Sequence, residues 1–190
     1  MCCRCTEFAI VTAIVRNISF VRDTGQRKDK MELELTNRIL RNELFCTTLR
    51  RIEKLEEGRI FCGHSLPHLL DTARIALILC RERGISADAD VIYSAALLHD
   101  IGRAAQYTDG TPHDEAGCII AEEILRQVDC GEDKMQEILR LVASHRKGGG
   151  EDTAEGIFCI ADKKSRLCFA CPAQSECNWS IDKRNMKIEV

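Results

Sequence analysis

The stretch Ala95-Ala96-Leu97-Leu98-His99-Asp100-Ile101-Gly102 decides the fold prediction, because it joins an apolar run to a His-Asp pair and a glycine. The run of helix formers predicts a buried helix, and Gly102 is placed to end it. His99 and Asp100 then lie at the inner end of a core helix, where each needs a hydrogen bond or a metal ion. A second pair, His113-Asp114, shows that the dipeptide alone is not diagnostic. The positions of the other histidines therefore become decisive.

Length and composition indicate one soluble helical domain. The chain has 190 residues, of which 45% are apolar and 30% charged, enough for a substantial core. Three prolines and 5% aromatic residues, with many Leu, Ile, Ala, Glu and Arg, favour an all-α fold. A net charge of −3 gives no indication of a nucleic-acid-binding surface, so we expect no nucleic-acid partner.

The cysteine content indicates a reducing compartment. Twelve cysteines could suggest a secreted disulfide protein, but such scaffolds are usually smaller and rich in loops. We therefore expect a cytoplasmic protein. Cys46, Cys80 and Cys118 fall within apolar helical patterns and are expected to be ordinary buried thiols.

The first 30 residues differ from the rest of the chain. The apolar run Phe8–Val15 is too short to span a bilayer, and no small-residue cleavage site follows it, so we expect no membrane partner. Purine-rich codons serve Gln26–Lys30, as they would in a bacterial ribosome-binding site. We expect residues 1–30 to be an over-annotated extension and Met31 to be the natural start. The main domain is then expected at residues 31–180, with a cysteine-rich segment at 159–179 and a tail at 181–190.

Apolar residues that recur at threes and fours predict six helices and no strand of any length. The first covers Met31 to about Glu57, the second begins at an N-cap Ser65 and ends at Gly84, and the third begins at an N-cap Ser86. Residues 107–112 are expected to form a loop, since Asp109-Gly110 favours a turn. The remaining helices are expected at about His113–Leu125, Glu132–His145 and Ala154–Leu167.

The histidines coincide with the predicted helix boundaries. The six candidate metal ligands at or near helix ends are His68, His99, Asp100, His113, His145 and Asp162. Four imidazoles and two carboxylates are the usual ligands of two transition ions such as iron, manganese, cobalt or zinc. Any one of these histidines alone would more often be an ordinary core or surface residue, so the prediction depends on the whole set.

The order of these residues resembles the HD superfamily of metal-dependent phosphohydrolases. His68–Ala76 is similar to the family's first-ligand helix, Ala96–Arg103 to its His-Asp motif, and Ile160–Asp162 to its closing Asp helix. The resemblance covers roughly residues 60–170 and implies an HD-domain helical bundle. His113 and His145 match the two extra histidines of members that bind a second metal.

The resemblance implies hydrolysis of a small phosphate ester, a nucleotide or dinucleotide, by water activated between two metal ions. The six ligands would hold the ions, with Asp100 bridging them and His99 and Asp100 at the catalytic centre. Positive side chains close to the ligands are candidates for clamping the phosphate, or are solvated surface cations: Arg103, Lys147, Lys163 and Arg166. His64 is either an outer proton donor or a plain loop histidine.

Two other functions remain open on the same ligands. The HD-type mixed-valence di-iron oxygenases show a similar order of residues, and some HD modules bind a nucleotide without catalysis. The ligands cannot separate hydrolysis from oxygenation, because the same residues serve both chemistries.

The cysteine-rich segment carries a separate prediction. Cys168, Cys171 and Cys177 form a C-x2-C-x5-C motif, which can hold a structural zinc or an iron–sulfur cluster if a fourth ligand is supplied. Cys62 and Cys159 are the candidates for that fourth ligand. The alternative is that these are free thiols packed around Trp179.

Overall fold

The computed structural model describes residues 32–146 and 148–188. Within these residues the regular structure is helical and no strand is present, which confirms the all-α prediction. The α-helices are α2 (Glu34–Arg41), α3 (Glu43–Leu55), α4 (Leu66–Glu82), α5 (Ala89–Leu98), α6 (Arg103–Asp109), α7 (His113–Gln127), α8 (Glu132–Ser144) and α9 (Ala154–Lys164). Three single-turn 3-10 helices follow: η2 (Cys168–Ala170), η3 (Gln174–Glu176) and η4 (Ile181–Lys183).

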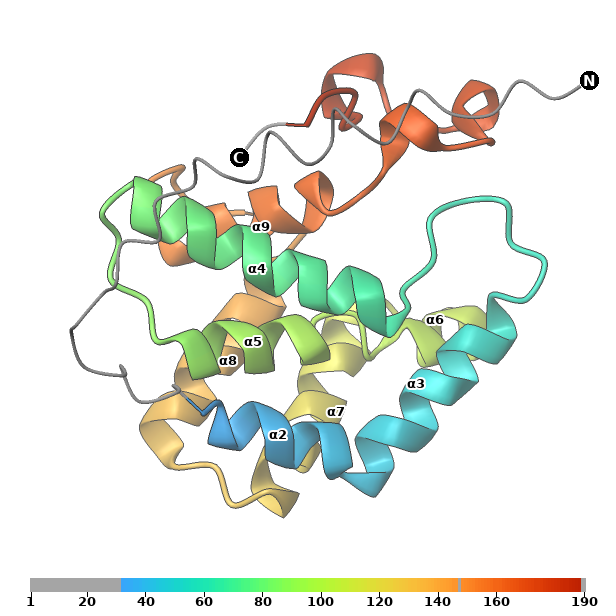
Figure 1. The fold of residues 1–190 in the computed structure, drawn as a ribbon. Coiled ribbons are helices and arrows are strands. Elements are labelled where there is room, and N and C mark those ends of the chain that lie inside the picture. The colour runs from blue at the N-terminus through green and yellow to red at the C-terminus, as the bar shows by residue number, and fades with distance from the viewer. Residues whose placement is uncertain (1–31, 147, 189–190) are drawn as a thin grey trace, which may run out of the picture. The chain divides into compact units, whose positions relative to one another are not determined.

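Helix α5 is the centre of the bundle. It packs against α2, α4 and α8 (Figure 1), and eight of its ten residues are buried. A helix that is apolar on all sides has to be covered on all sides, and the sequence of α5 meets that condition. Leu97 and Leu98 are fully buried, and the burial of each side chain stabilises the fold by about 1.5–3 kcal/mol. The helix therefore fixes the position of His99 and Asp100, which follow directly.

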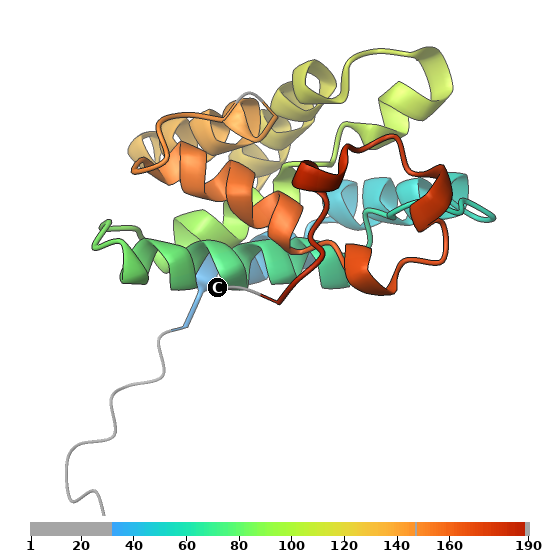
Figure 2. The ribbon, with the colours of Figure 1, turned by 90° about the horizontal axis from the view of Figure 1, so that it is seen from above.

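Helices α4 and α9 pack side by side (Figure 2), and α8 contacts both α7 and α9. The first turn of α4 meets the end of α9, where the ring of His68 bonds to the hydroxyl of Ser165. The two helices are therefore antiparallel. This arrangement brings the start of α4 and the end of α9 together at the C-terminal end of α5.

Asp90 links α2 to α5. Its carboxylate accepts hydrogen bonds from the backbone N–H groups of Leu35 and Thr36, at 2.9 and 2.8 Å, and from the Thr36 hydroxyl at 2.6 Å. These N–H groups lie in the first turn of α2, where a helix has no internal acceptors. Asp90 thus caps a helix that is distant in sequence.

Several predicted boundaries are wrong. The first predicted helix is interrupted at Asn42, whose extended backbone separates α2 from α3 and whose side chain caps α3. Asp88 rather than Ser86 caps α5, because its side chain accepts from the N–H of Asp90. Tyr107 lies in α6 rather than in a loop, and α6 ends at Gly110, which has the left-handed φ of 81°.

Two further predictions concern the ends of the chain. The predicted extension at residues 1–30 and the proposed start at Met31 lie outside the described residues. The described residues from Leu33 onward belong to one compact unit. Among the described helices, none is both long and apolar enough to span a bilayer.

Candidate metal centre

The six predicted ligands come together where five helices end or begin. His68 lies in the first turn of α4, His113 is the first residue of α7, and Asp162 lies in the last turn of α9. His99 and His145 are the residues that directly follow α5 and α8, and Asp100 follows His99. All except Asp162 are buried, and the Asp162 side chain is only 17% exposed. The geometry can therefore be described as two groups of donors that share one residue.

The first group contains His68, His99, Asp100 and Asp162, whose donor atoms all lie within 4.8 Å of one another. Asp100 Oδ2 lies 3.0 Å from His99 Nε2 and 3.5 Å from His68 Nε2. Asp162 Oδ1 lies 3.4 Å from His68 Nε2 and 3.6 Å from His99 Nε2. Two imidazoles thus face two carboxylates across a space suited to one cation.

The second group contains Asp100, His113 and His145. Asp100 Oδ1 lies 3.7 Å from His113 Nε2, and the two histidine Nε2 atoms are 3.2 Å apart. Asp100 therefore presents one carboxylate oxygen to each group. This is the arrangement expected of a carboxylate that bridges two ions.

Backbone and hydroxyl oxygens determine which nitrogen of three rings faces inward. His99 Nδ1 donates to the carbonyl of Ala96 at 2.8 Å, and His145 Nδ1 donates to that of Val142 at 2.5 Å. His68 Nδ1 donates at 2.8 Å to the hydroxyl of Ser165, whose own proton goes to the carbonyl of Asp162. Since each Nδ1 carries the proton, each neutral ring has its lone pair on Nε2, the atom that faces the cluster.

Four buried polar atoms in this cluster have no hydrogen-bond partner: His68 Nε2, His99 Nε2, Asp100 Oδ2 and His113 Nδ1. Leaving such atoms unpaired is costly, and buried polar atoms are nearly always satisfied. Three of the four are the inward-facing donors of the first group. The donor set and its missing partners therefore fit a divalent metal ion.

The charges of the cluster also favour a cation. Burial alone would raise the pKa of Asp100, but the neighbouring His99 and His68 hold it well below its usual value. Burial would lower the pKa of His99, whereas Asp100 and Asp162 raise it to about 10. The two carboxylates thus favour positive charge at His99, which a bound metal ion can supply in place of a proton. Burial and Arg103 lower the pKa of His113 to about 3, so this ring is neutral and available as a ligand.

Not every predicted phosphate-binding cation lies at the cluster. Arg103 Nε donates to Asp100 Oδ1 at 2.8 Å. Arg166 Nη2 lies 3.6 Å from Asp100 Oδ2 and 3.4 Å from Asp162 Oδ1. Lys163 instead donates to the sulfur of Cys159 at 3.2 Å. Lys147 lies outside the described residues. Arg103 and Arg166 therefore remain the predicted phosphate-binding residues.

His64 lies beside the cluster with partners that the sequence did not indicate. Its Nδ1 bonds to Glu56 Oε1, which also accepts from the Tyr107 hydroxyl at 2.7 Å, and its Nε2 lies 3.8 Å from Asp100 Oδ2. Glu56 and Tyr107 come from α3's end and α6, so no local motif could reveal them. Ser165 carried a weak signal, since it is three residues after Asp162 and therefore on the same side of the helix.

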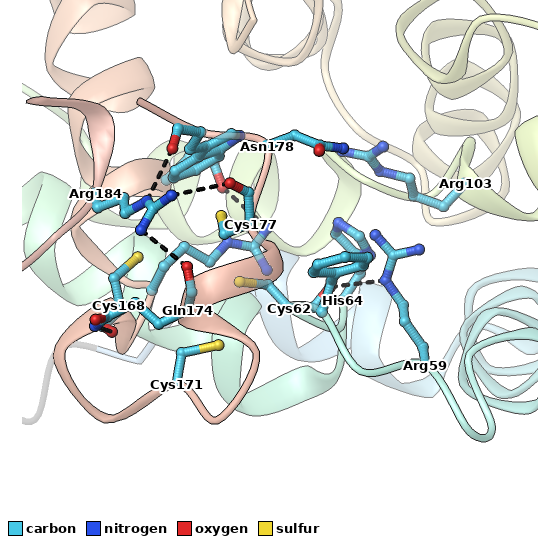
Figure 3. A pocket seen from close by; sticks show the side chains of 14 residues that line it. Arg59, Cys62, His64, Arg103, Cys168, Cys171, Gln174, Cys177, Asn178 and Arg184 are labelled. Carbon is cyan, nitrogen blue, oxygen red and sulfur yellow. Dashed lines mark hydrogen bonds and ion pairs between the residues drawn. The ribbon is translucent and has the colours of Figure 1, made fainter. Parts of the chain in front are cut away.

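A cavity of about 250 Å³ opens beside the cluster (Figure 3). Asp162 and His64 line it together with Phe61, Trp179 and eight cysteine and arginine residues. These eight residues are Arg59, Cys62, Arg103, Arg166, Cys168, Cys171, Cys177 and Arg184. The cavity thus connects the candidate metal ligands to positive, aromatic and sulfur-containing side chains.

The predicted metal site at the C-terminal cysteines is not supported by donor distances alone. Within the described residues, no three thiol sulfurs lie within 4.8 Å of one another. Of the two candidate fourth ligands, Cys62 lines the cavity with Cys168, Cys171 and Cys177, whereas Cys159 accepts a hydrogen bond from Lys163 elsewhere. The site stays a prediction, and Cys62 is the better candidate.

The fold and the site together define an all-helical protein with a buried cluster of four histidines and two aspartates. The family model described as "HD domain" matches residues 66–167, more than half of the chain. The chain therefore belongs to the HD domain family, as the resemblance predicted.

Individual relatives agree with this assignment. The chain is 40% identical over 152 residues to an uncharacterized protein of Clostridium beijerinckii, covering 80% of this chain and 96% of that protein. It is 27% identical to proteins named ribonuclease Y of Chloroflexus aurantiacus, over 60% of this chain, and of Acetivibrio thermocellus, over 74%. The chain spans only 20% and 25% of these two longer proteins. No solved structure matches the chain with comparable significance.

Proposed function

We propose that the protein is a metal-dependent phosphohydrolase that hydrolyses a small phosphate ester, a nucleotide or dinucleotide, using two transition-metal ions. The observation that carries this proposal is the pair of donor groups that share Asp100, with histidine Nε2 atoms facing inward. Membership of the HD family, in which metal-dependent hydrolysis is general, supports the same chemistry.

The roles of the ligands follow from the two groups. His68, His99, Asp100 and Asp162 would hold one ion, and Asp100, His113 and His145 the other. Bound ions of this kind supply a water that ionises near neutral pH and neutralise charge on the phosphate. Ser165 is a positioning residue, because its hydroxyl accepts from His68 Nδ1 and so leaves the lone pair on Nε2, the atom that would hold the first ion.

The outer residues would bind the substrate and exchange its protons. Arg103 and Arg166 line the cavity beside Asp162, where their guanidinium groups can donate to phosphate oxygens. Burial lowers the pKa of His64 despite its bond to Glu56, which favours the neutral ring. Because Glu56 holds Nδ1, Nε2 is left to exchange a proton with the substrate or its leaving group.

The size and lining of the cavity support a small anionic substrate. A volume of about 250 Å³ lined by Arg59, Arg103 and Arg166 suits a compact phosphate ester, and Phe61 and Trp179 offer apolar faces for a base. The relatives named ribonuclease Y indicate phosphodiester bonds in RNA as a second substrate to test. The four cysteines that line the cavity are free thiols, which supports a reducing cytoplasmic compartment.

The test is a substrate screen on metal-loaded protein. The chain is stripped of metal, reloaded with manganese, iron, cobalt or zinc, and assayed for phosphate or nucleotide release. The substrates are mono-, di- and cyclic nucleotides, dinucleoside polyphosphates and a short RNA. The matched variants are Asp100→Asn and Asp114→Asn, the two carboxylates that follow a histidine, because Asp114 pairs with Arg146 outside both donor groups.

We expect wild type and Asp114→Asn to hydrolyse the same substrate, and Asp100→Asn to lose at least about 100-fold in rate. Hydrolysis of RNA alone would place the substrate among nucleic acids and overturn the small-ester assignment. A protein with its full metal content that hydrolyses none of these substrates would overturn the proposal. Oxygen consumption by the iron-loaded form would then indicate the oxygenase chemistry.

A further inference from the structure

Four cysteine side chains from two distant parts of the chain line one cavity (Figure 3). Cys62 belongs to the connector before α4. The other three, Cys168, Cys171 and Cys177, belong to the segment that follows α9, residues 165–188, which we call the C-terminal segment. All four are free thiols. In the folded protein, Cys62 therefore places a fourth sulfur at the cavity that the three cysteines of the C-x2-C-x5-C motif line.

The C-terminal segment contributes little to the main hydrophobic core. The main hydrophobic core of the described residues contains no member after Ala161. Leu167 and Ile181 are 64% and 77% exposed, and the only regular structure is three single turns. Loops of this length are uncommon unless they are functional, and segments without a core usually depend on disulfides or metals.

Polar bonds fix the path of this segment around the cysteines. The guanidinium of Arg184 donates to the carbonyls of Trp179, Gln174 and Cys177, at 2.8, 2.9 and 2.9 Å. Gln174 in turn donates to the carbonyl of Cys168 at 2.8 Å. The backbone between the first and last of the three cysteines is therefore held as one unit with its thiols at the cavity.

The electrostatic surroundings favour a bound cation with thiolate ligands. Arg166 and Arg184 line the same cavity as the four sulfurs. Positive side chains stabilise thiolates, the form of cysteine that binds metal, and they offset the negative charge of a centre with four thiolate ligands.

We infer that Cys62, Cys168, Cys171 and Cys177 are the ligands of a second metal centre, separate from the His/Asp cluster. With metal–sulfur bonds of about 2.3 Å, a single tetrahedral zinc ion needs sulfurs about 3.8 Å apart. These four sulfurs are not among the donor groups of the described residues whose atoms lie within 4.8 Å of one another, so a single zinc ion does not fit them. An iron–sulfur cluster fits the donor type, because its cysteines bind different iron atoms and do not have to meet at one ion.

This centre leaves room for the proposed substrate. In Figure 3, Cys168, Cys171 and Cys177 lie on the side of Arg184, Arg59 and Arg103 lie on the opposite side, and Cys62 lies between them next to His64. The metal would occupy the Arg184 side and phosphate the Arg103 side. The inference does not depend on the proposed function, because it concerns different ligands and a different part of the chain.

The experiment measures metal bound by the full chain. Protein purified without oxygen is analysed for iron, zinc and acid-labile sulfide per chain, before and after reconstitution with iron and sulfide or with zinc. The same analysis is applied to Cys171→Ser/Cys177→Ser, whose side chains are half-buried, and to the control Cys130→Ser, which lies between α7 and α8 outside the cavity. Circular dichroism verifies that each variant is folded, and cobalt substitution reports thiolate ligands through intense visible absorption.

We expect wild type and Cys130→Ser to carry iron with acid-labile sulfide and a broad visible absorption. The double variant should lose both while keeping its helix content and the metal of the His/Asp cluster. Zinc with thiolate-type cobalt spectra would support the centre and overturn its assignment as a cluster. Absence of thiolate-bound metal in wild type after both reconstitutions, or equal metal in the folded double variant, would overturn the centre itself. If the double variant unfolds, the cobalt spectrum of wild type decides.

Discussion

Replacing Gly102 with alanine would test whether the close approach of the α5 end to α7 sets the position of the metal ligands. A β-carbon built at Gly102 lies 2.1 Å from the carbonyl oxygen of His113 and 2.5 Å from the backbone nitrogen of Gly117. The backbone of Gly102, with φ −74° and ψ −5°, is one that alanine adopts freely. The effect of the substitution is therefore steric.

The magnitude follows from these distances. An ordinary contact begins at 3.4 Å, so the start of α7 must move by about 1.3 Å and carry His113 with it. Overpacking of this kind costs about 1–3 kcal/mol, and the loss of chain entropy in the unfolded state offsets only about 0.4–1 kcal/mol of it. Displacement of a ligand should also weaken metal binding by roughly tenfold or more.

Gly117 provides a matched control in the same contact. Its own β-carbon would lie 3.6 Å from the Gly102 nitrogen, an ordinary contact, and the residue is inside α7. Gly117→Ala should therefore be neutral or stabilise the protein by up to about 1 kcal/mol through helix propensity. Urea unfolding followed by circular dichroism, with metal affinity measured by chelator competition, compares both variants with wild type. The reasoning is refuted if Gly102→Ala is as stable as wild type and binds metal equally well.

Four other predictions address the site and the fold. Ser165→Ala should weaken metal binding about 10–100-fold without loss of helix content, because His68 Nδ1 loses its acceptor; equal affinity in chelator competition contradicts this. Removal of metal should lower the free energy of unfolding by about 2.7 kcal/mol relative to protein with free ion at 100 times Kd, seen as a lower Tm on chelation; an unchanged Tm argues against binding. Asp90→Ala should cost about 1–3 kcal/mol in urea unfolding, because three donors of α2 lose their acceptor. Burial raises the pKa of Glu56, but the hydrogen bonds that it accepts from His64 and Tyr107 lower it from 4.5 to about 2. The contribution of ionised Glu56 to the free energy of unfolding is therefore complete above pH 4.5 and is lost as the pH falls towards 2. Glu56→Gln should remove that part of the acid sensitivity of unfolding, and identical pH curves for both proteins would refute it.

The sequence predicted the helices better than the connections between them. The start of α4, with Pro67 in its first turn, and the starts of α7, α8 and α9 follow from local patterns of apolar residues, caps and glycines. The break at Asn42 did not, because the apolar spacing continues across it and asparagine occurs both inside helices and at caps. The decisive fact there is that α2 packs on α5 while α3 packs on α6, which depends on contacts distant in sequence.

The site shows the same division. The six candidate ligands were predicted because histidines at helix ends form a local pattern, and family resemblance ordered them. Glu56, Tyr107 and Ser165 were missed, because their contacts with His64 and His68 join separate helices. Lys163 was predicted at the phosphate, yet its helical position directs it at Cys159, one turn earlier.

By itself the sequence determined the all-α class and the set of donor types, since helical periodicity and side-chain chemistry are properties of short segments. Only the tertiary structure decided that the donors divide into two groups sharing Asp100, and that Cys62 joins the three C-terminal cysteines at one cavity. The physical reason is that these groupings depend on how buried helices pack around α5. That packing is fixed by contacts between residues far apart in the chain, which no local pattern encodes.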